Sequence, residues 1–355
     1  MLNSTENASS LAAGKEDLWK HVVYISEGAV ISFSNFFFFL TIVRYFALRT
    51  QKECLTLCAL AFADALNGFA YFICGLYRSY LVLTNTHNML MSHWDCMLTP
   101  HNVIFAFSDS IASLMLLVIS IDRFIAVADP LRYLGLSTTY SYALIGSAFL
   151  YSFLSGGLAI LISYFLSGEK KFPALCFTSM AIGPLYSYFL ATYYMFALLS
   201  IVVYLAVYLV HLKKKTVISP TEPSENCRQQ LKRQRKFTFS LGVSCMFTFL
   251  FYVLPMLLNS LYTAIDYTPR GLTVVPLYAF MWSNLNPLLN VFIFVIRHRE
   301  IRFAMRNLVI CKELPPDTRL WLMNRGTVTT ATVAERRIRY TRSTAEPVQR
   351  AVHRF

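Results

Sequence analysis

The sequence predicts an all-α membrane protein, a bundle of seven transmembrane helices followed by a short amphipathic eighth helix. Of its 355 residues, 56% are hydrophobic and 14% are charged, whereas charged residues make up roughly a quarter of a typical soluble domain. Apolar residues gather in seven spans, each long enough for a helix to cross some 30 Å of hydrocarbon. These spans lie at roughly 22–47, 54–80, 101–128, 138–166, 181–211, 237–263 and 271–296. Because they are continuous rather than alternating in polarity, helices are favoured over a barrel, and we expect one bundle over residues 22–296.

The distribution of positive charge predicts the orientation of this bundle. With the N-terminus outside, six of the 32 Lys and Arg residues face outwards and 26 face inwards. Basic residues of membrane proteins concentrate in cytoplasmic loops, so we expect an outer N-terminus and a plasma-membrane location. The same bias accounts for the net charge of +13 without a nucleic-acid partner. The outer basic residues are Lys15, Lys20, Arg78, Lys170, Lys171 and Arg270.

The two ends of the chain are polar. Residues 1–21 are expected to form an extracellular tail, in which Asn3 and Asn7 each begin an Asn-x-Ser/Thr glycosylation pattern. Residues 312–355 are basic and rich in Ser and Thr, and we expect a disordered cytoplasmic tail. Its basic clusters suit the anionic lipids of the inner leaflet.

The third span ends in an acidic and a basic residue, Asp122-Arg123, followed by Phe124 and a Pro130-Leu-x-Tyr133 turn. Ionisable groups at the edge of the hydrocarbon are costly and tend to be functional. The stretch closely resembles the end of the third helix in rhodopsin-like (class A) G-protein-coupled receptors, with Phe124 in place of a tyrosine. This resemblance implies that Asp122 holds Arg123 in the inactive state and that Arg123 contacts the G protein once the sixth helix swings outwards.

Polar residues within other spans extend the resemblance, which covers roughly residues 30–311. Asn35 lies in the first span, Asp64 in the second, and Asn286-Pro287 in the seventh. A carboxylate within a membrane needs a partner or a water-filled cavity. The resemblance implies one polar network joining these residues, with Asn290 where the family keeps a tyrosine.

The later spans depart from the family pattern. The fourth has no tryptophan, the fifth has no proline beyond its outer end, and Val253 replaces a tryptophan two residues before Pro255. Similar losses are shown by nematode chemosensory serpentine receptors, which would place the protein in a ciliary membrane. The base of the sixth helix carries Arg235, where many relatives have an acidic partner for the third helix, so we expect appreciable ligand-independent signalling.

Three cysteines have expected roles. Cys96 and Cys176 lie on the outer side, where disulfides persist, and the resemblance implies that they pair. Cys96 stands 27 residues before Arg123, about two more than in the family, so an insertion or bulge is expected between them. Residues 297–311 predict an amphipathic interfacial helix, and Cys311 at its end is either a palmitoylation site or an unmodified thiol.

The sequence narrows the chemical class of the ligand only by excluding some classes. The seventh span has no lysine for a retinal Schiff base, and Phe105 stands where aminergic relatives keep an aspartate. Asp109, one helical turn deeper, is the alternative anchor, although packing against the second helix is an equal explanation. A small, partly apolar ligand such as an odorant, or a peptide, suits the aromatic outer halves. The expected pocket residues are Asn102, Phe105, Ser108, Asp109 and Tyr252.

The function predicted is transduction of an extracellular ligand to a heterotrimeric G protein. The chain shows no metal-ligand spacing, phosphate-binding loop or catalytic motif, so we expect neither an enzyme nor a cofactor. Two alternatives remain open: a seven-span channel or transporter, and a receptor-like accessory protein that couples to no G protein.

Overall fold

A computed structural model describes residues 2–216, 238–255 and 282–310. Among them, five helices are long and apolar enough to cross a membrane, and two shorter apolar helices accompany them. The long spans are Leu18–Arg44, Lys52–Leu83, Pro100–Ala128, Thr138–Phe165 and Thr178–Lys213, and the short ones are Thr238–Val253 and Leu285–Arg297. Each of the seven predicted spans therefore contains a helix, and the described parts of the sixth and seventh are shorter than the expected spans.

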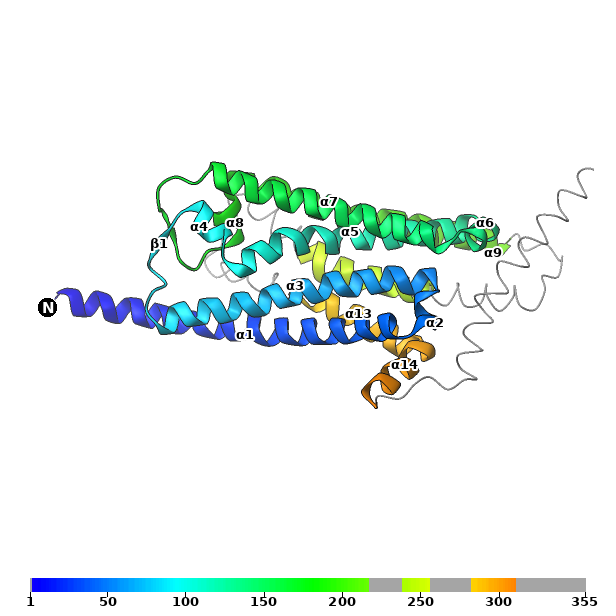
Figure 1. The fold of residues 1–355 in the computed structure, drawn as a ribbon, viewed down its shortest axis with the longest axis horizontal. Helices are drawn as coiled ribbons and strands as arrows, with labels where there is room; N and C mark the ends of the chain where they lie inside the picture. The colour runs from blue at the N-terminus through cyan, green and yellow to red at the C-terminus, as the bar shows by residue number, and fades with distance from the viewer. Residues whose placement is uncertain (1, 217–237, 256–281, 311–355) are drawn as a thin grey trace, which may run out of the picture.

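The long helices lie side by side along the long axis of the molecule (Figure 1). α1 (Leu2–Arg44) packs along α3 (Lys52–Leu83), while α5 (Pro100–Ala128) contacts α3, α7 (Thr138–Phe165) and α9 (Tyr186–Thr216). With neighbours on three sides, α5 is the central helix of the described bundle. α1 starts at Leu2, so residues expected to form a separate polar tail, Asn3 and Asn7 included, continue the first helix.

Glycines set the close approach of α1 to α3. A Cβ atom on Gly28 would lie 2.4 Å from the backbone nitrogen of Phe72, and one on Gly68 would lie 2.6 Å from that of Ser32. Helices within a membrane gain most of their mutual attraction from such close backbone packing. This contact fixes the rotation of α3 about its own axis, and Asp64 lies on this helix.

Short elements cover the end of the bundle where α1 begins, which is the predicted outer end and is called the outer end below (Figure 1). β1 (Leu90–Met91) pairs antiparallel with β2 (Phe172–Pro173). Three further short elements complete this layer, which we call the lid: α4 (His93–Met97), α8 (Thr178–Ile182) and the 3₁₀ turn η1 (Gly183–Leu185). Gly183 has a φ of +72°, a value that glycine adopts readily, and the chain turns there into α9.

The opposite end, predicted to face inwards and called the inner end below, carries α2 (Phe46–Arg49), α6 (Pro130–Gly135), α13 (Leu285–Arg297) and α14 (Arg299–Val309). Ile301 and Ala304 of α14 are buried in the main apolar cluster, and Met305 and Leu308 pack against it. The predicted amphipathic helix is therefore present over Arg299–Val309, and it lies against the end of α1.

The sixth span contains an irregular turn. Residues Phe249–Val253 form a π-helical turn, η2, closed by a bond from the backbone N–H of Leu254 to the carbonyl of Phe249. The following residue, Pro255, has no N–H to donate. The structure thus places a π turn just before this proline, and such turns occur often at functional sites.

Candidate ligand cavity and coupling site

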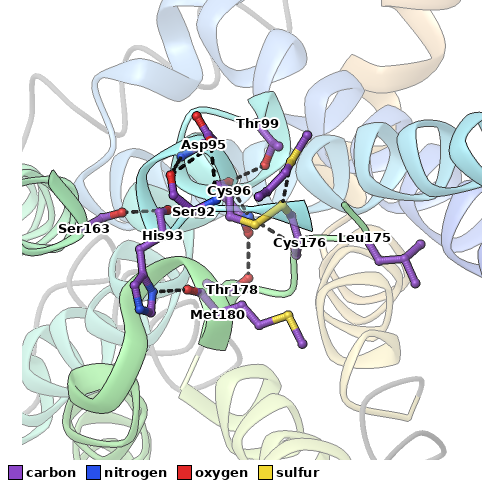
Figure 2. Close-up of a disulfide and its surroundings, with 12 residues drawn as sticks. Ser92, His93, Asp95, Cys96, Thr99, Ser163, Leu175, Cys176, Thr178 and Met180 are labelled. Atoms are coloured by element: carbon purple, nitrogen blue, oxygen red, sulfur yellow. Dashed lines mark hydrogen bonds between the residues drawn. A yellow bond between two sulfur atoms is a disulfide. The ribbon is translucent and has the colours of Figure 1, made fainter. Parts of the chain in front are cut away.

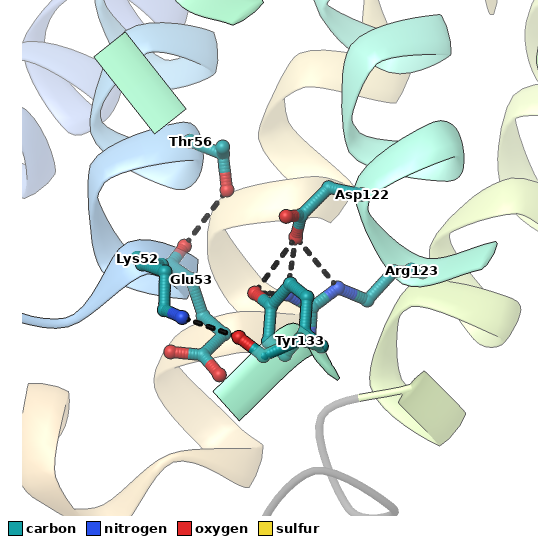
Figure 3. Close-up of polar contacts among 6 residues, drawn as sticks. All are labelled: Lys52, Glu53, Thr56, Asp122, Arg123 and Tyr133. Atoms are coloured by element: carbon teal, nitrogen blue, oxygen red, sulfur yellow. Dashed lines mark hydrogen bonds and ion pairs between the residues drawn. The ribbon is translucent and has the colours of Figure 1, made fainter. Parts of the chain in front are cut away.

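At the inner end of α5, Asp122, Arg123 and Tyr133 form one buried cluster (Figure 3). Arg123 donates from Nε to Asp122 Oδ2 at 3.0 Å, and its Nη2 bonds the same oxygen. Nη2 also donates to the Tyr133 hydroxyl at 2.8 Å, which lies 3.3 Å from Asp122 Oδ2. All three residues are 0% exposed. A dehydrated ion pair of this kind is stable only with such additional hydrogen bonds.

Local sequence explains why Tyr133 reaches Arg123. Asp129 ends α5 with a φ of −139°, and its carboxylate accepts from the backbone N–H of Arg132 at 3.1 Å. Pro130 occupies the first helical position, where its missing N–H costs nothing. The resulting one-and-a-half turns of α6 carry Tyr133 back under α5. Pro130 thus acts through the geometry of α6, and Phe124, also predicted for coupling, is half-buried at the end of α5.

Lys52 at the start of α3 holds α6 in place, a role that the sequence did not suggest. Its Nζ donates to the carbonyl oxygens of Tyr133 at 2.6 Å and Leu136 at 2.7 Å, and lies 4.6 Å from the centre of the Tyr133 ring. These carbonyls belong to the end of α6, where a cation is favourable. Burial raises the pKa of Tyr133 well above its usual value, so the hydroxyl remains protonated beside Asp122.

In the middle of the bundle, Asp64 on α3 and Asn286 and Asn290 on α13 were expected to form a polar network, and two residues of the sixth span that were not expected, Ser244 and Thr248, contact it. Asn290 hydrogen-bonds the Asp64 carboxylate and accepts from the Ser244 hydroxyl. Thr248 donates to Asn286 Oδ1 at 2.9 Å. Asn290, in the position of the family tyrosine, therefore ties the seventh helix to the second and sixth.

Two other predicted members of that network have different surroundings. Asn35 is buried, and its Nδ2 donates within its own helix, to the carbonyl of Ile31 at 3.0 Å. Pro287 lies beside the cavity described next.

A cavity extends from this network towards the lid. Its volume, counted as space open to the centres of water molecules, is about 90 Å³. Asp64 and Asn290 line one part, and Asp109 with Tyr252 lines another. Four further tyrosines from α3 and α9 also line it: Tyr71, Tyr186, Tyr193 and Tyr194.

The structure brings some predicted pocket residues to this cavity and places others elsewhere. Asp109 lies on its wall and accepts from Asn67 Nδ2 of α3 at 3.2 Å, and Tyr252 lies there too. Phe105 instead packs edge-on against the Tyr71 ring at 4.9 Å, and Ser108 is fully buried within the bundle. Of the five expected pocket residues, Asp109 and Tyr252 are thus the two among the described cavity-lining residues.

Asn102 serves the lid rather than the cavity. Its Nδ2 donates to the carbonyls of Cys96 at 2.9 Å and Cys176 at 3.1 Å, and its Oδ1 accepts from Thr178 at 2.9 Å. Figure 2 shows the predicted Cys96–Cys176 disulfide at the centre of these contacts. Cys96 lies on α4 rather than on α5, and the intervening turn at Leu98 accounts for the extra residues before Arg123.

Further contacts join the lid to the helices. The Ser92 backbone N–H and hydroxyl donate to Asp95 at 3.1 and 2.9 Å, closing a capping box on α4 and lowering the pKa of Asp95. The His93 ring meets the carbonyl of Met180 at 2.5 Å (Figure 2). From α3, Arg78 donates to the carbonyl of Leu175 at 3.0 Å. Arg78 and Asn102 therefore bind the lid to α3 and α5.

Three predicted features lie outside the described residues: Arg235, Cys311 and the tail 312–355.

The chain matches the family described as serpentine type 7TM GPCR chemoreceptor Srsx over residues 29–309. It belongs to that family, and it is therefore a multi-pass membrane protein and a chemoreceptor, not an enzyme. The expected resemblance to class A receptors and to nematode chemoreceptors is confirmed. No curated protein matches the chain.

Proposed function

We propose that this chemoreceptor binds an extracellular ligand in the cavity beside Asp109 and passes the signal to a heterotrimeric G protein at its inner face. We place it in the plasma membrane with its N-terminus outside. The observation that carries the proposal is the buried Asp122–Arg123–Tyr133 cluster, because it holds a guanidinium at the inner end of the central helix by contacts that can be broken. A residue that contacts a G protein in one state must be held elsewhere in the other.

The described contacts run from the cavity along the sixth span towards the end of the bundle that carries this cluster. Tyr252 lies on the cavity wall, its ring 6.1 Å from that of Tyr194 on α9. Lower on the sixth span, Ser244 bonds Asn290, and Tyr204 of α9 bonds the backbone at Thr238. A ligand that binds one packing of these helices more tightly than another shifts the equilibrium between them.

Release of Arg123 is the proposed consequence of that shift. The guanidinium must exchange its bonds to Asp122 and Tyr133 for new ones, and any reorientation of the sixth span changes the space beside it. Hydrogen bonds to charged groups contribute about 1.5–3 kcal/mol each. Two or three such bonds are a barrier that ligand binding energy can overcome, so the cluster suits a switch.

The test compares basal second-messenger signalling of the wild type with that of Arg123→Ala at matched surface expression. We expect the wild type to exceed mock-transfected cells, since Arg235 stands where an acidic lock would be, and Arg123→Ala to fall to the mock level. Arg306→Ala, which removes an exposed arginine from α14, is the control and should keep the wild-type signal. A signal unchanged by Arg123→Ala would contradict the proposal and favour the channel or transporter alternative. A wild-type signal equal to that of mock cells would favour the accessory-protein alternative.

A further inference from the structure

We infer that the cavity takes a small organic cation, a protonated amine, with the Asp109 carboxylate as its counter-ion. The inference rests on the proposed function in one respect, that the cavity is the ligand site. The sequence alone did not favour an amine, because Phe105, one turn above Asp109, stands where aminergic relatives keep an aspartate.

Asp109 is the first part of the site. It is only partly buried, because one side of it faces the cavity, and its Oδ1 receives the amide of Asn67. An amide supplies no positive charge. A carboxylate inside a membrane bundle is costly unless a partner or water meets it, so this carboxylate suits a positive group that arrives with the ligand.

The tyrosines are the second part. Five tyrosines line the same cavity as Asp109: Tyr71, Tyr186, Tyr193, Tyr194 and Tyr252. Aromatic faces attract cations within about 6 Å of the ring centre, more strongly when water is excluded. No lysine, arginine or histidine is found among the described lining residues, so the described wall offers an anion no positive charge.

Asp64 gives a second, independent reason to expect a positively charged ligand. It is 4% exposed, it lines the same cavity, and its Oδ2 has no hydrogen-bond partner within the described residues. Behind the cavity wall, Glu27 accepts from Asn284, another lining residue, at 3.2 Å. The carboxylates of Asp64 and Asp109 on the cavity wall therefore favour positive charge inside it, which an odorant without charge would not use.

The size of the cavity limits the cation. Holding one water takes roughly 10–15 Å³ of space open to the centres of water molecules. The cavity volume of about 90 Å³ therefore holds roughly six to nine water-sized groups. An amine with a ring or a short branched chain fits this volume. A peptide fits only if most of it stays outside.

Purified full-length receptor in detergent provides the test, because binding is then read as a rise in melting temperature without any G protein. The probes are 2-phenylethylammonium and cyclohexylammonium, with 2-phenylethanol as the neutral match and benzoate as the anion. We expect both ammonium probes to stabilise the wild type, and the alcohol and benzoate to need at least tenfold higher concentration for the same rise.

Two variants assign the effect to Asp109. Asp109→Asn keeps the size of the side chain and an oxygen for Asn67, and it should weaken the ammonium probes at least tenfold. Glu169→Gln removes one carboxylate from an exposed outer loop, where it pairs with Lys171 at 2.9 Å, and should change nothing. If Asp109→Asn fails to fold, Tyr252→Phe and Tyr252→Leu replace it, and only the loss of the ring in Tyr252→Leu should weaken binding.

Several results would overturn the inference: no stabilisation by either ammonium probe at millimolar concentration, equal stabilisation by the alcohol, or unchanged binding in Asp109→Asn. The binding experiment and the Arg123 signalling experiment can succeed or fail independently of each other. Ammonium binding by a receptor that does not signal would support the ligand class and contradict the coupling, whereas Arg123-dependent signalling without ammonium binding would contradict the ligand class alone.

Discussion

The inner cluster and the cavity both hold charged groups inside the bundle, yet their surroundings differ. At the inner end, Asp122 meets Arg123 and Tyr133 at once, and none of the three is exposed. In the cavity, the partner of the Asp109 carboxylate among the described residues is the amide of Asn67, and open space lies beside it. A cluster whose opposite charges pair with each other stabilises one state of the receptor, while a carboxylate that meets no positive group among the described residues leaves binding energy for a partner. The difference indicates that the two ends of the bundle have opposite roles, one holding the resting state and the other waiting for a ligand.

The largest expected effect comes from the lid, which closes the outer end. Cys176→Ser removes the disulfide to Cys96, which spans 80 residues, and loss of a native disulfide typically costs about 2–5 kcal/mol. We expect surface expression to fall severely, measured by antibody labelling of intact cells. The double variant Cys96→Ser/Cys176→Ser should lose no more than the single one, because either change breaks the same bond. A double variant much worse than the single one would show that the cysteines act separately.

A smaller effect is expected when the inner cluster of Asp122, Arg123 and Tyr133 is opened. Tyr133→Phe keeps the ring but removes the hydroxyl that bonds Arg123 and Asp122. A loss of about 1–2 kcal/mol from the resting state corresponds to a shift of roughly 5–30-fold between two states. Basal second-messenger output should therefore rise, with surface expression unchanged.

The control for this change is Tyr142→Phe, which removes the hydroxyl of an exposed tyrosine on α7. A Tyr133→Phe receptor with the wild-type basal signal would contradict the idea that the cluster holds the resting state.

Lys52 should contribute less, because it acts on Arg123 through α6. Lys52→Met removes the two bonds to the carbonyls of Tyr133 and Leu136, whereas Lys52→Arg keeps a cation in that place. We expect Lys52→Met to raise basal signalling by less than Tyr133→Phe does, and Lys52→Arg to restore much of the wild-type level.

The double variant Lys52→Met/Tyr133→Phe sharpens this expectation. Residues that share one network show non-additive effects, so the double variant should resemble Tyr133→Phe alone. Strictly additive effects would mean that Lys52 stabilises the fold without positioning Tyr133.

The inner cluster was more accessible to sequence analysis than the cavity, for a physical reason. Asp122, Arg123 and Tyr133 lie within one helix end and the turn after it, so their order along the chain records their contact. Lys52 joins them by binding backbone carbonyls 81 and 84 residues away, and a carbonyl leaves no pattern in the sequence.

The cavity depends on how separate helices are rotated. Tyr71 and the tyrosines of α9 lie in spans that are apolar on most sides, so their periodicity does not say which side faces Asp109. Asn102 was expected in the pocket for the same reason, since a polar residue near the outer end of the third span suits a pocket or a lid equally. Its bonds to Cys96 and Cys176 depend on a disulfide that brings distant loops together.

The smallest expected effect concerns the pH dependence of the lid. Hydrogen bonds from the Ser92 backbone N–H and hydroxyl hold the pKa of Asp95 below its usual range. Ionised Asp95 therefore stabilises α4 above about pH 4, the usual value of an unfolded aspartate, and this contribution is lost as the pH falls through the lower folded pKa. Charges placed at the start of a helix are worth ~0.3–1 kcal/mol, so opening of the lid should become roughly two- to fivefold easier at the acidic limit.

The rate at which a phosphine reductant cleaves the Cys96–Cys176 disulfide measures that opening on the purified receptor. Between pH 5.5 and pH 3 the wild type should be reduced faster as the pH falls, after correction for the reductant's own pH dependence on a model disulfide. Asp95→Asn cannot ionise, so its lid should open readily at both pH values. Glu169→Gln, which changes an exposed carboxylate of the outer loop, should follow the wild type. If Asp95→Asn retains the wild-type acceleration, another acid controls the lid, and the two ends of the receptor differ less in their dependence on charge than their contacts indicate.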